Sequence, residues 1–233
     1  MNTRFFMFPD RRQFLALTGA SLTMASLPAG PASAATSSRQ FSVYLGRKQV
    51  GNSSVRLSRS GSRVDAEIEV SLHLNILGLI KFDYHLTNRE SWRDGVLQEM
   101  RSTTNNNGSV EYANATRTGR GLEIEGSDYQ GVISGSPATT SYFTTDFLER
   151  RTWINTQNGK VFTPSIGRVG AANFATTEGS TPCTRYAIRG GVNSDLYYDS
   201  NFEWMGSSFS VAGRTARIAM SGRGGSLNRI WRG

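Results

Sequence analysis

The chain has 233 residues, a formal net charge of +8 and a single cysteine. One cysteine cannot form a disulfide within the chain, so the fold has to be stabilised by packing rather than by cross-links. The basic charge comes without a helix-turn-helix, zinc-finger or RNA-binding signature, which argues against a nucleic-acid-binding protein. A chain of this length can bury about 70% of its unfolded surface in one core, which predicts a single main domain.

Residues 1–34 have the three-part pattern of an export signal. A basic start ends in the run Arg11-Arg12-Gln13-Phe14-Leu15, an apolar segment continues to residue 27, and small residues follow at Ala32-Ser33-Ala34. This order predicts a twin-arginine signal peptide that is cleaved near Ala34, and therefore a periplasmic location. The apolar segment is shorter than the ~20 residues of a membrane-spanning helix, and no cysteine follows it to carry a lipid. We therefore expect no permanent membrane anchor.

Residues 35–221 show the period-two alternation of half-buried β-strands. Every even-numbered residue from Ala66 to Ile76 is apolar, and the odd-numbered residues between them are polar. Residues 81–87 repeat this parity with Phe82, Tyr84 and Leu86. The pattern predicts two strands that pair antiparallel, each with one apolar face.

Turns rich in glycine, asparagine and serine divide the chain into roughly 11 strands of this kind. They are drawn from twelve candidate ranges with uncertain boundaries: residues 41–45, 53–58, 63–77, 80–91, 96–104, 109–116, 121–126, 160–169, 183–189, 193–198, 203–211 and 214–221. Residues 144–153 are the best candidate for a short helix, with Thr144 or Thr145 as its N-cap. Residues 222–233, which are rich in glycine and arginine, are expected to form a flexible basic tail; contact of Trp231 with anionic lipid is the alternative.

So many antiparallel strands cannot stay flat, because strand twist accumulates and the sheet edges need cover. We therefore predict an all-β fold, in which an antiparallel meander curls into a barrel or half-barrel. The concave side is the candidate binding site, and an interior filled by its own side chains is the alternative. The expected ligand-binding residues are Ile68, Val70, Leu72, Leu74, Phe82, Tyr84, Leu86, Tyr142 and Phe143. Phe41 and Val43 of the first expected strand would join this lining.

Short runs spread over residues 41–199 resemble an uncharacterised family of exported bacterial proteins, a domain of unknown function. The runs are Phe41-Ser42-Val43-Tyr44, Val50-Gly51, Trp92-Arg93-Asp94-Gly95, Thr140-Ser141-Tyr142-Phe143, Thr156 with Gly159-Lys160, and Asp195-Leu196-Tyr197-Tyr198-Asp199. That family is similar in fold to the LolA and LolB lipoprotein carriers, whose incomplete barrels shield acyl chains. The resemblance implies a half-barrel with an apolar hollow. It supplies no catalytic residues, and the chain lacks the lipid anchor of LolB-like proteins.

The two histidines and one pair of acidic residues are the remaining candidates for chemistry. A three-residue hairpin loop centred on Leu79 would place His73 opposite His85. Zinc usually takes three or four ligands and only Asp83 is at hand, so we expect no metal or other cofactor. Asp195 and Asp199 share one strand face, as the carboxylates of a glycosidase would, but residues 199–201 also fit a simple turn. We name no catalytic residue.

The sequence therefore favours a periplasmic module that binds or carries an apolar, lipid-like molecule. Two alternatives stay open. One is a hydrolase of envelope polymers that uses the region of Asp195 and Asp199, and the other is an envelope protein whose strand edge recruits a partner. The oligomeric state and the identity of the ligand are left open.

Overall fold

A computed structural model describes residues 34–76, 80–211 and 213–233. The first half of the described chain is a run of long strands: β1 (Ala35–Leu45), β2 (Lys48–Ser60), β3 (Arg63–Ile76), β4 (Ile80–Arg93), β5 (Val96–Asn106), β6 (Ser109–Thr118), β7 (Gly121–Gly126) and β8 (Gln130–Ile133). The second half contains β9 (Ala138–Thr139), the 3-10 helix η1 (Thr145–Glu149), β10 (Trp153–Ile154), β11 (Val161–Phe162), β12 (Ser165–Thr176), β13 (Gly179–Arg189), β14 (Ser194–Tyr198), β15 (Trp204–Val211), β16 (Arg214–Ser221) and the helix α1 (Leu227–Arg232).

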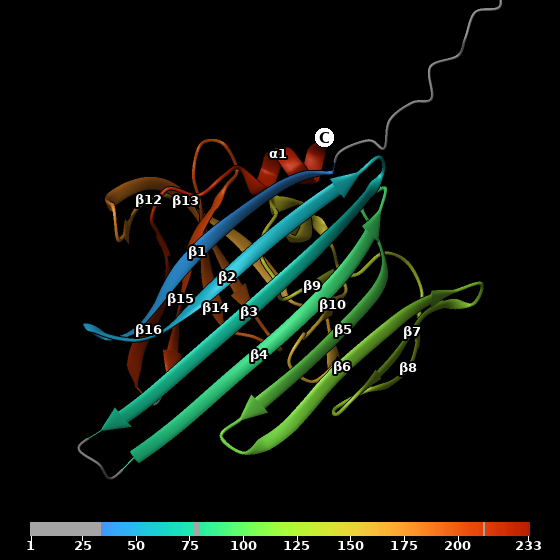
Figure 1. The fold of residues 1–233 in the computed structure, drawn as a ribbon, viewed down its shortest axis with the longest axis horizontal. Coiled ribbons are helices and arrows are strands. Elements are labelled where there is room, and N and C mark those ends of the chain that lie inside the picture. The colour runs from blue at the N-terminus through green and yellow to red at the C-terminus, as the bar shows by residue number, and fades with distance from the viewer. Residues whose placement is uncertain (1–33, 77–79, 212) are drawn as a thin grey trace, which may run out of the picture. The chain divides into compact units, whose positions relative to one another are not determined.

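Thirteen of these strands form one large antiparallel sheet, in the order β12-β13-β14-β15-β16-β1-β2-β3-β4-β5-β6-β7-β8. Strands that are consecutive in the sequence pair with each other within β1–β8 and within β12–β16. The two runs are joined by the pairing of β1 with β16. This pairing joins the early and late parts of the chain in one curved sheet (Figure 1). The sheet is not closed, since β12 and β8 are its two edges. The predicted all-β meander is confirmed, and it takes the form of an open half-barrel.

The hairpin of β3 and β4 has the predicted parity but a different register. His73 lies opposite Asp83, and His85 lies opposite Ser71, so the two histidines are not cross-strand neighbours. The loop that we centred on Leu79 lies outside the described residues. The register differs from the expected one by two residues, and a shift of two leaves every side chain on the same face of the sheet. The apolar pairs Leu72↔Tyr84 and Leu74↔Phe82 therefore still share one face.

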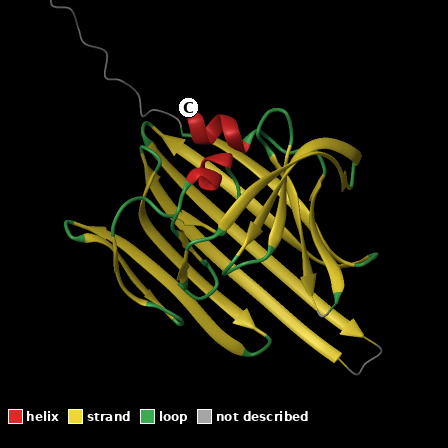
Figure 2. Cartoon of the chain, turned by 180° about the vertical axis from the view of Figure 1, so that it is seen from behind, coloured by secondary structure: helices red, strands yellow, loops and turns green. Residues whose placement is uncertain are grey.

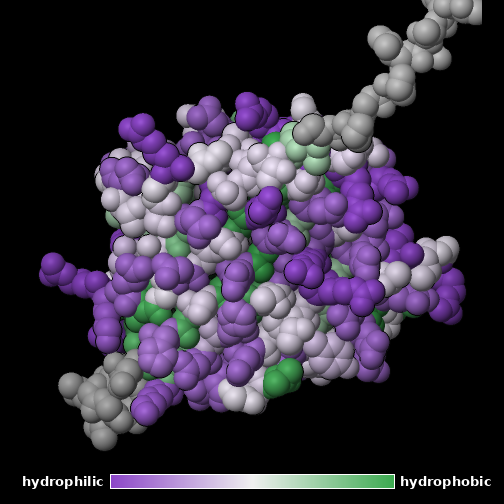
Figure 3. Space-filling view, in the orientation of Figure 1, coloured by the Kyte–Doolittle hydropathy of each residue, from purple (hydrophilic) through white to green (hydrophobic). Residues whose placement is uncertain are grey.

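The convex face of the sheet is mainly hydrophilic (Figure 3). Its odd-numbered side chains on β3 and β4 pair across the strands: Arg89 approaches Glu67 to 3.7 Å, and His73 bonds to Asp83. These side chains are largely exposed, so the pairs contribute little to stability. No helix of the described residues is both long and apolar enough to cross a membrane.

The concave side is partly filled by residues 138–162, which contain β9, η1, β10 and β11 and which we call the inner segment (Figure 2). β9, β10 and β11 form a small second sheet, and Trp153 and Ile154 of β10 are fully buried. The helix predicted over 144–153 is shorter than expected, since only residues 145–149 form a 3-10 helix. Thr144 caps it, as predicted, by accepting a hydrogen bond from the Asp146 amide. The helix ends at Glu149, with Arg150 as its extended C-cap, and Trp153 then pairs with Phe162 in the small sheet.

The end of the chain is folded, which corrects the prediction of a flexible tail over 222–233. Ser226 caps α1 by accepting from the Arg229 amide, and Leu227, Ile230 and Trp231 are buried. The Trp231 ring lies 5.4 Å from the ring of Trp92, and its Nε1 donates to Asp146 at 2.7 Å. Apolar residues spaced three and four apart give α1 one buried face, and this packing explains why the segment is helical rather than frayed.

Candidate functional site

A cavity of about 530 Å³ lies between the concave face of the sheet and the inner segment. Eight of the nine predicted ligand-binding residues line it. They are Ile68, Val70, Leu72 and Leu74 of β3, Phe82, Tyr84 and Leu86 of β4, and Tyr142 of the inner segment. The period-two pattern of β3 and β4 thus places one continuous apolar wall on the hollow side.

Phe143 does not line the cavity. Its side chain is fully buried, with its ring 5.1 Å from that of Phe147 and 5.4 Å from that of Trp231. Tyr142 and Phe143 are consecutive, and Tyr142 has a positive φ of 58°. The chain turns sharply at this point, so the Tyr142 ring faces the cavity while the Phe143 ring lies in the core.

The cavity has a second apolar wall on the neighbouring strands β15, β16 and β1. It contains Phe209 and Val211 of β15, Ile218 of β16, and Val43 and Leu45 of β1. Of these residues only Val43 was expected in the lining, whereas Phe41, expected with it, is fully buried against Trp204 instead. The strands β15 and β16 were predicted, but their inward faces were not. Residues 204–207 at the start of β15 are all buried, without alternation, because both faces of the strand are covered there. A period-two analysis therefore gives no signal there.

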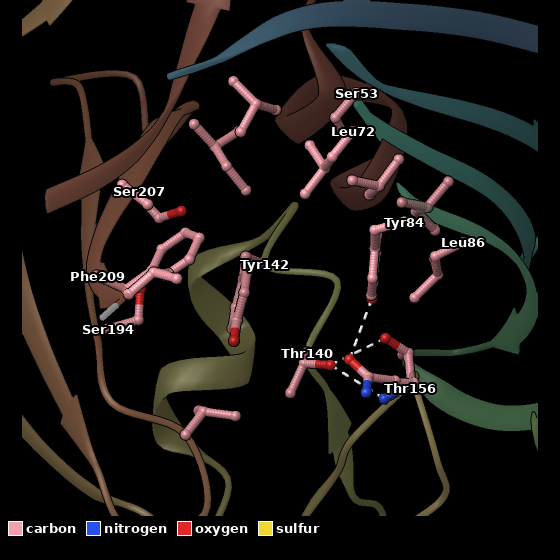
Figure 4. A pocket seen from close by; sticks show the side chains of 18 of the residues that line it. Ser53, Leu72, Tyr84, Leu86, Thr140, Tyr142, Thr156, Ser194, Ser207 and Phe209 are labelled. Atoms are coloured by element: carbon pink, nitrogen blue, oxygen red, sulfur yellow. Dashed lines mark hydrogen bonds between the residues drawn. The ribbon is translucent and has the colours of Figure 1, made fainter. Parts of the chain in front are cut away.

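One end of the cavity is polar. Thr140, Thr156 and Gln157 of the inner segment meet Tyr84 of the β4 wall there (Figure 4). The Tyr84 hydroxyl donates to Gln157 Oε1 at 3.2 Å, and the Thr140 and Thr156 hydroxyls are 2.9 Å apart. Gln157 Nε2 in turn donates to the carboxylate of Glu111 at 3.0 Å. The cavity is thus amphipathic: its walls are mainly apolar, a hydrogen-bonded group of side chains lies at this end, and Ser194 and Ser207 add hydroxyls on the side of β14 and β15.

The part of the cavity lining that the structure describes contains no aspartate, glutamate, lysine, arginine or histidine. Burial raises the pKa of Tyr84 to about 12 and raises the pKa of Tyr142 further. Both phenols therefore stay protonated and neutral at any physiological pH. The lining offers apolar contact and neutral hydrogen bonds, and no ionised group for acid–base work.

The comparisons with known proteins agree with this fold. The family defined as a domain of unknown function, DUF6134, matches residues 41–221. The chain belongs to the DUF6134 family. No curated protein matches the sequence.

Among solved structures, this DUF6134 chain is similar to a β-barrel-like protein of another domain of unknown function, DUF1849, from Brucella abortus. The two are 6% identical, with a TM-score of 0.52 over 81% of this chain and 97% of that one. At this identity the likeness concerns the fold alone. It supports a barrel-like architecture for the DUF6134 domain.

Behind the cavity lies a buried carboxyl group that the sequence analysis did not single out. Glu90 of β4 is 2% exposed and accepts hydrogen bonds from Ser141 Oγ at 2.5 Å, Asn88 Nδ2 at 2.7 Å and Trp92 Nε1 at 2.9 Å. Ser141 also lines the cavity. Burial raises the pKa of Glu90 and outweighs the opposing effect of these donors. The Glu90 network fixes the inner segment against β4.

We expect Glu90→Gln to flatten the dependence of stability on pH. The folded state holds the Glu90 proton more tightly than the unfolded state does, so the stabilisation is complete below the ordinary pKa of 4.5 and is lost as the pH rises through the folded-state pKa. A glutamine has no such proton. Urea unfolding measured at several pH values should show a smaller decrease above pH 4.5 for Glu90→Gln than for the wild type. Glu99→Gln, at an exposed glutamate beside Arg101, is the control. Equal slopes for the wild type and Glu90→Gln would contradict the assignment.

The other candidates for chemistry each have partners of their own. Asp195 pairs with Arg185 at 2.6 Å and with Arg189 at 2.9 Å. Asp199 Oδ1 accepts from the backbone amides of Asn201 and Glu203, both at 2.9 Å, as expected for the simple turn. Within the described residues, no three histidine, cysteine, aspartate or glutamate side chains gather as metal ligands would. These contacts give no geometric support to the hydrolase alternative.

Proposed function

We propose that this DUF6134 protein binds a lipid-like molecule in the half-barrel cavity and acts as a carrier or binding module in the periplasm. The observation that carries the proposal is the cavity itself: about 530 Å³, with apolar side chains from two separate walls facing it. Ligand sites in proteins usually enclose ~300–1,000 Å³ and are mainly apolar with a few placed polar groups. The DUF6134 cavity has that size and composition.

The energy available from the apolar walls is enough for useful affinity. Each buried methylene contributes ~0.8 kcal/mol, so eight methylenes contribute about 6 kcal/mol before the cost of ordering the chain. This corresponds to a dissociation constant of tens of micromolar at best, about 40 μM. Such a module would hold its cargo reversibly, as a carrier must.

The proposed location rests on the leader sequence. The order of the paired arginines Arg11 and Arg12, the short apolar segment and the small residues before Ala35 supports twin-arginine export. The open half-barrel supports the resemblance to carriers of the LolA and LolB kind, whose incomplete barrels shield acyl chains. In the periplasm, a shielded hollow would let an apolar molecule cross an aqueous space.

Native mass spectrometry tests the proposal. The protein should be purified by gentle extraction from at least two bacterial hosts and measured before and after solvent extraction. We expect a species heavier than the apo chain by the mass of a lipid-like molecule, which solvent extraction removes. An apo mass from every host, together with no uptake of added lipid, would refute the proposed function.

A further inference from the structure

Tyr142 has a backbone conformation that bulky residues rarely adopt. Its φ of 58° lies in the left-handed region, which favours glycine and asparagine. Contacts on either side hold it there: the Tyr198 hydroxyl donates to its carbonyl at 2.8 Å, Ser141 bonds to Glu90, and Phe143 is fixed in the core. Residues with such rare backbone conformations are common at ligand sites, where the surrounding structure imposes them. At Tyr142 the positive φ directs the side chain into the cavity.

The Tyr142 hydroxyl makes no hydrogen bond to any residue that the structure describes, although its ring lies between Trp153 and Trp204, with ring centroids 6.0 and 6.1 Å away. Figure 4 shows the hydroxyls of Tyr142 and Tyr84 directed to the same end of the cavity, where Thr140 and Thr156 lie. Tyr142 is only partly buried and lines the cavity, so its hydroxyl is accessible from the cavity. The unused donor therefore points to a group that a ligand would bring.

The neighbouring hydrogen bonds determine which kind of group fits. Gln157 Nε2 donates to both oxygens of Glu111, at 3.0 and 3.2 Å, so Gln157 presents its Oε1 toward Tyr84. Tyr84 uses its only proton on that oxygen, which leaves it no proton for a ligand. Tyr142 keeps its proton free. The end of the cavity thus offers a phenol donor, which matches an acceptor oxygen such as a carbonyl.

Charge gives the second restriction. No side chain of the described lining carries a formal charge, and both tyrosines are held in their neutral form. The Glu111 carboxylate lies behind Gln157 and already accepts its hydrogen bonds, outside the lining. An ion drawn into the cavity would therefore lose its hydration without a counter-charge in direct contact, which is strongly unfavourable. A neutral acceptor group loses much less hydration free energy on entering the cavity, and it regains one hydrogen bond there.

We propose that the cavity selects neutral amphiphiles: a hydrocarbon chain against the β3–β4 wall and an uncharged carbonyl oxygen, of an ester, amide or ketone, bonded to the Tyr142 hydroxyl. This inference rests on the proposed function, because it names the class of molecule that the same cavity takes. Charged single-chain amphiphiles of equal length are poor ligands.

The test is displacement of a fluorescent apolar probe by four molecules of equal chain length: tetradecane, methyl tetradecanoate, ionised tetradecanoate and tetradecyltrimethylammonium. We expect the ester to bind at least tenfold more tightly than either ion. Tyr142→Phe should lower the affinity for the ester about fivefold and leave the affinity for tetradecane unchanged, since only the hydrogen bond is removed. Tyr112→Phe removes the same oxygen from a tyrosine of β6 outside the cavity lining and should change neither affinity.

The outcomes separate the two claims. Equal affinities for the ester and the ions, or an unchanged ester affinity in a folded Tyr142→Phe variant, would overturn the selectivity while leaving the cavity a lipid site. Binding of none of the four molecules to the wild-type protein would refute the proposed function, and this inference with it. Thermal melting of both tyrosine variants checks that they remain folded, and methyl tetradecanoate should raise the wild-type melting temperature more than that of Tyr142→Phe.

Discussion

Replacing Glu203 with leucine should lower the free energy of unfolding by about 3–5 kcal/mol, because it leaves a buried guanidinium without its counter-charge. Glu203 is 3% exposed and Arg39 is 8% exposed, with Arg39 Nη2 at 3.4 Å from Glu203 Oε2. The same carboxylate accepts from the Ser226 hydroxyl and from the backbone amides of Leu227 and Asn228 at 3.1 and 3.2 Å. Glu203 therefore holds the first turn of α1 to the sheet as well as neutralising Arg39.

Urea unfolding measures this loss. Glu123→Leu is the matched control, because Glu123 pairs with Arg120 on the surface with 39% and 79% of their side chains exposed, and such pairs contribute less than ~1 kcal/mol. The double variant Arg39→Met with Glu203→Leu should recover much of the lost stability, since a buried ion pair can be replaced by apolar groups. A loss below about 1 kcal/mol for Glu203→Leu would show that α1 and Arg39 do not depend on this contact.

The second large effect concerns the cavity. Val70→Trp and Ile218→Trp each add a bulky side chain from opposite walls, and both wild-type residues are only partly buried, so the added volume goes into the cavity. If each tryptophan displaces about four methylenes of a ligand, the loss is ~3 kcal/mol, which corresponds to an affinity about 100-fold lower. Equilibrium binding of a fluorescent fatty-acyl probe measures this change.

Val110→Trp is the control for these variants. Val110 lies on β6 outside the cavity lining and is 71% exposed, so the same substitution there should leave probe binding unchanged. Thermal melting of all three variants shows whether overpacking, which costs ~1–3 kcal/mol, has disturbed the fold. Unchanged probe affinity in folded Val70→Trp and Ile218→Trp variants would place the binding site elsewhere.

The β3–β4 wall could be predicted because a strand has a period of two. Val70, Leu72 and Tyr84 were assigned to the hollow side from their parity alone, and the assignment survived an error in the hairpin register because that error was an even number of residues. Parity is a local property of the sequence. It needs no knowledge of the pairing partner.

The features that were missed depend on contacts between distant parts of the chain. The tail prediction failed because α1 is short and rich in arginine, and its helical state depends on burial of Trp231 against Trp92 and on Glu203 at its first turn. Local propensity cannot show such contacts. Phe143 was grouped with Tyr142 because the two are adjacent in sequence, and only the positive φ of Tyr142 separates their directions.

The polar end of the cavity was missed for the same reason. Thr140, Thr156 and Gln157 lie in an irregular segment without periodicity, and their hydrogen bonds with each other and with Tyr84 exist only in the folded chain. The apolar wall was thus predictable, while the groups that would decide ligand selectivity were not. This division is general for sites in which loops close over a sheet.

Photocrosslinking tests the central claim most directly. A fatty-acyl methyl ester with a diazirine at the end of its chain is added to the purified wild-type protein and irradiated, and the labelled peptides are identified by mass spectrometry. We predict labels on the inward-facing residues of β3, β4, β15 and β16, competed away by unlabelled ester and reduced in Ile218→Trp. Labels confined to the convex face or to the exposed strand edges, without competition, would contradict a lipid-binding hollow.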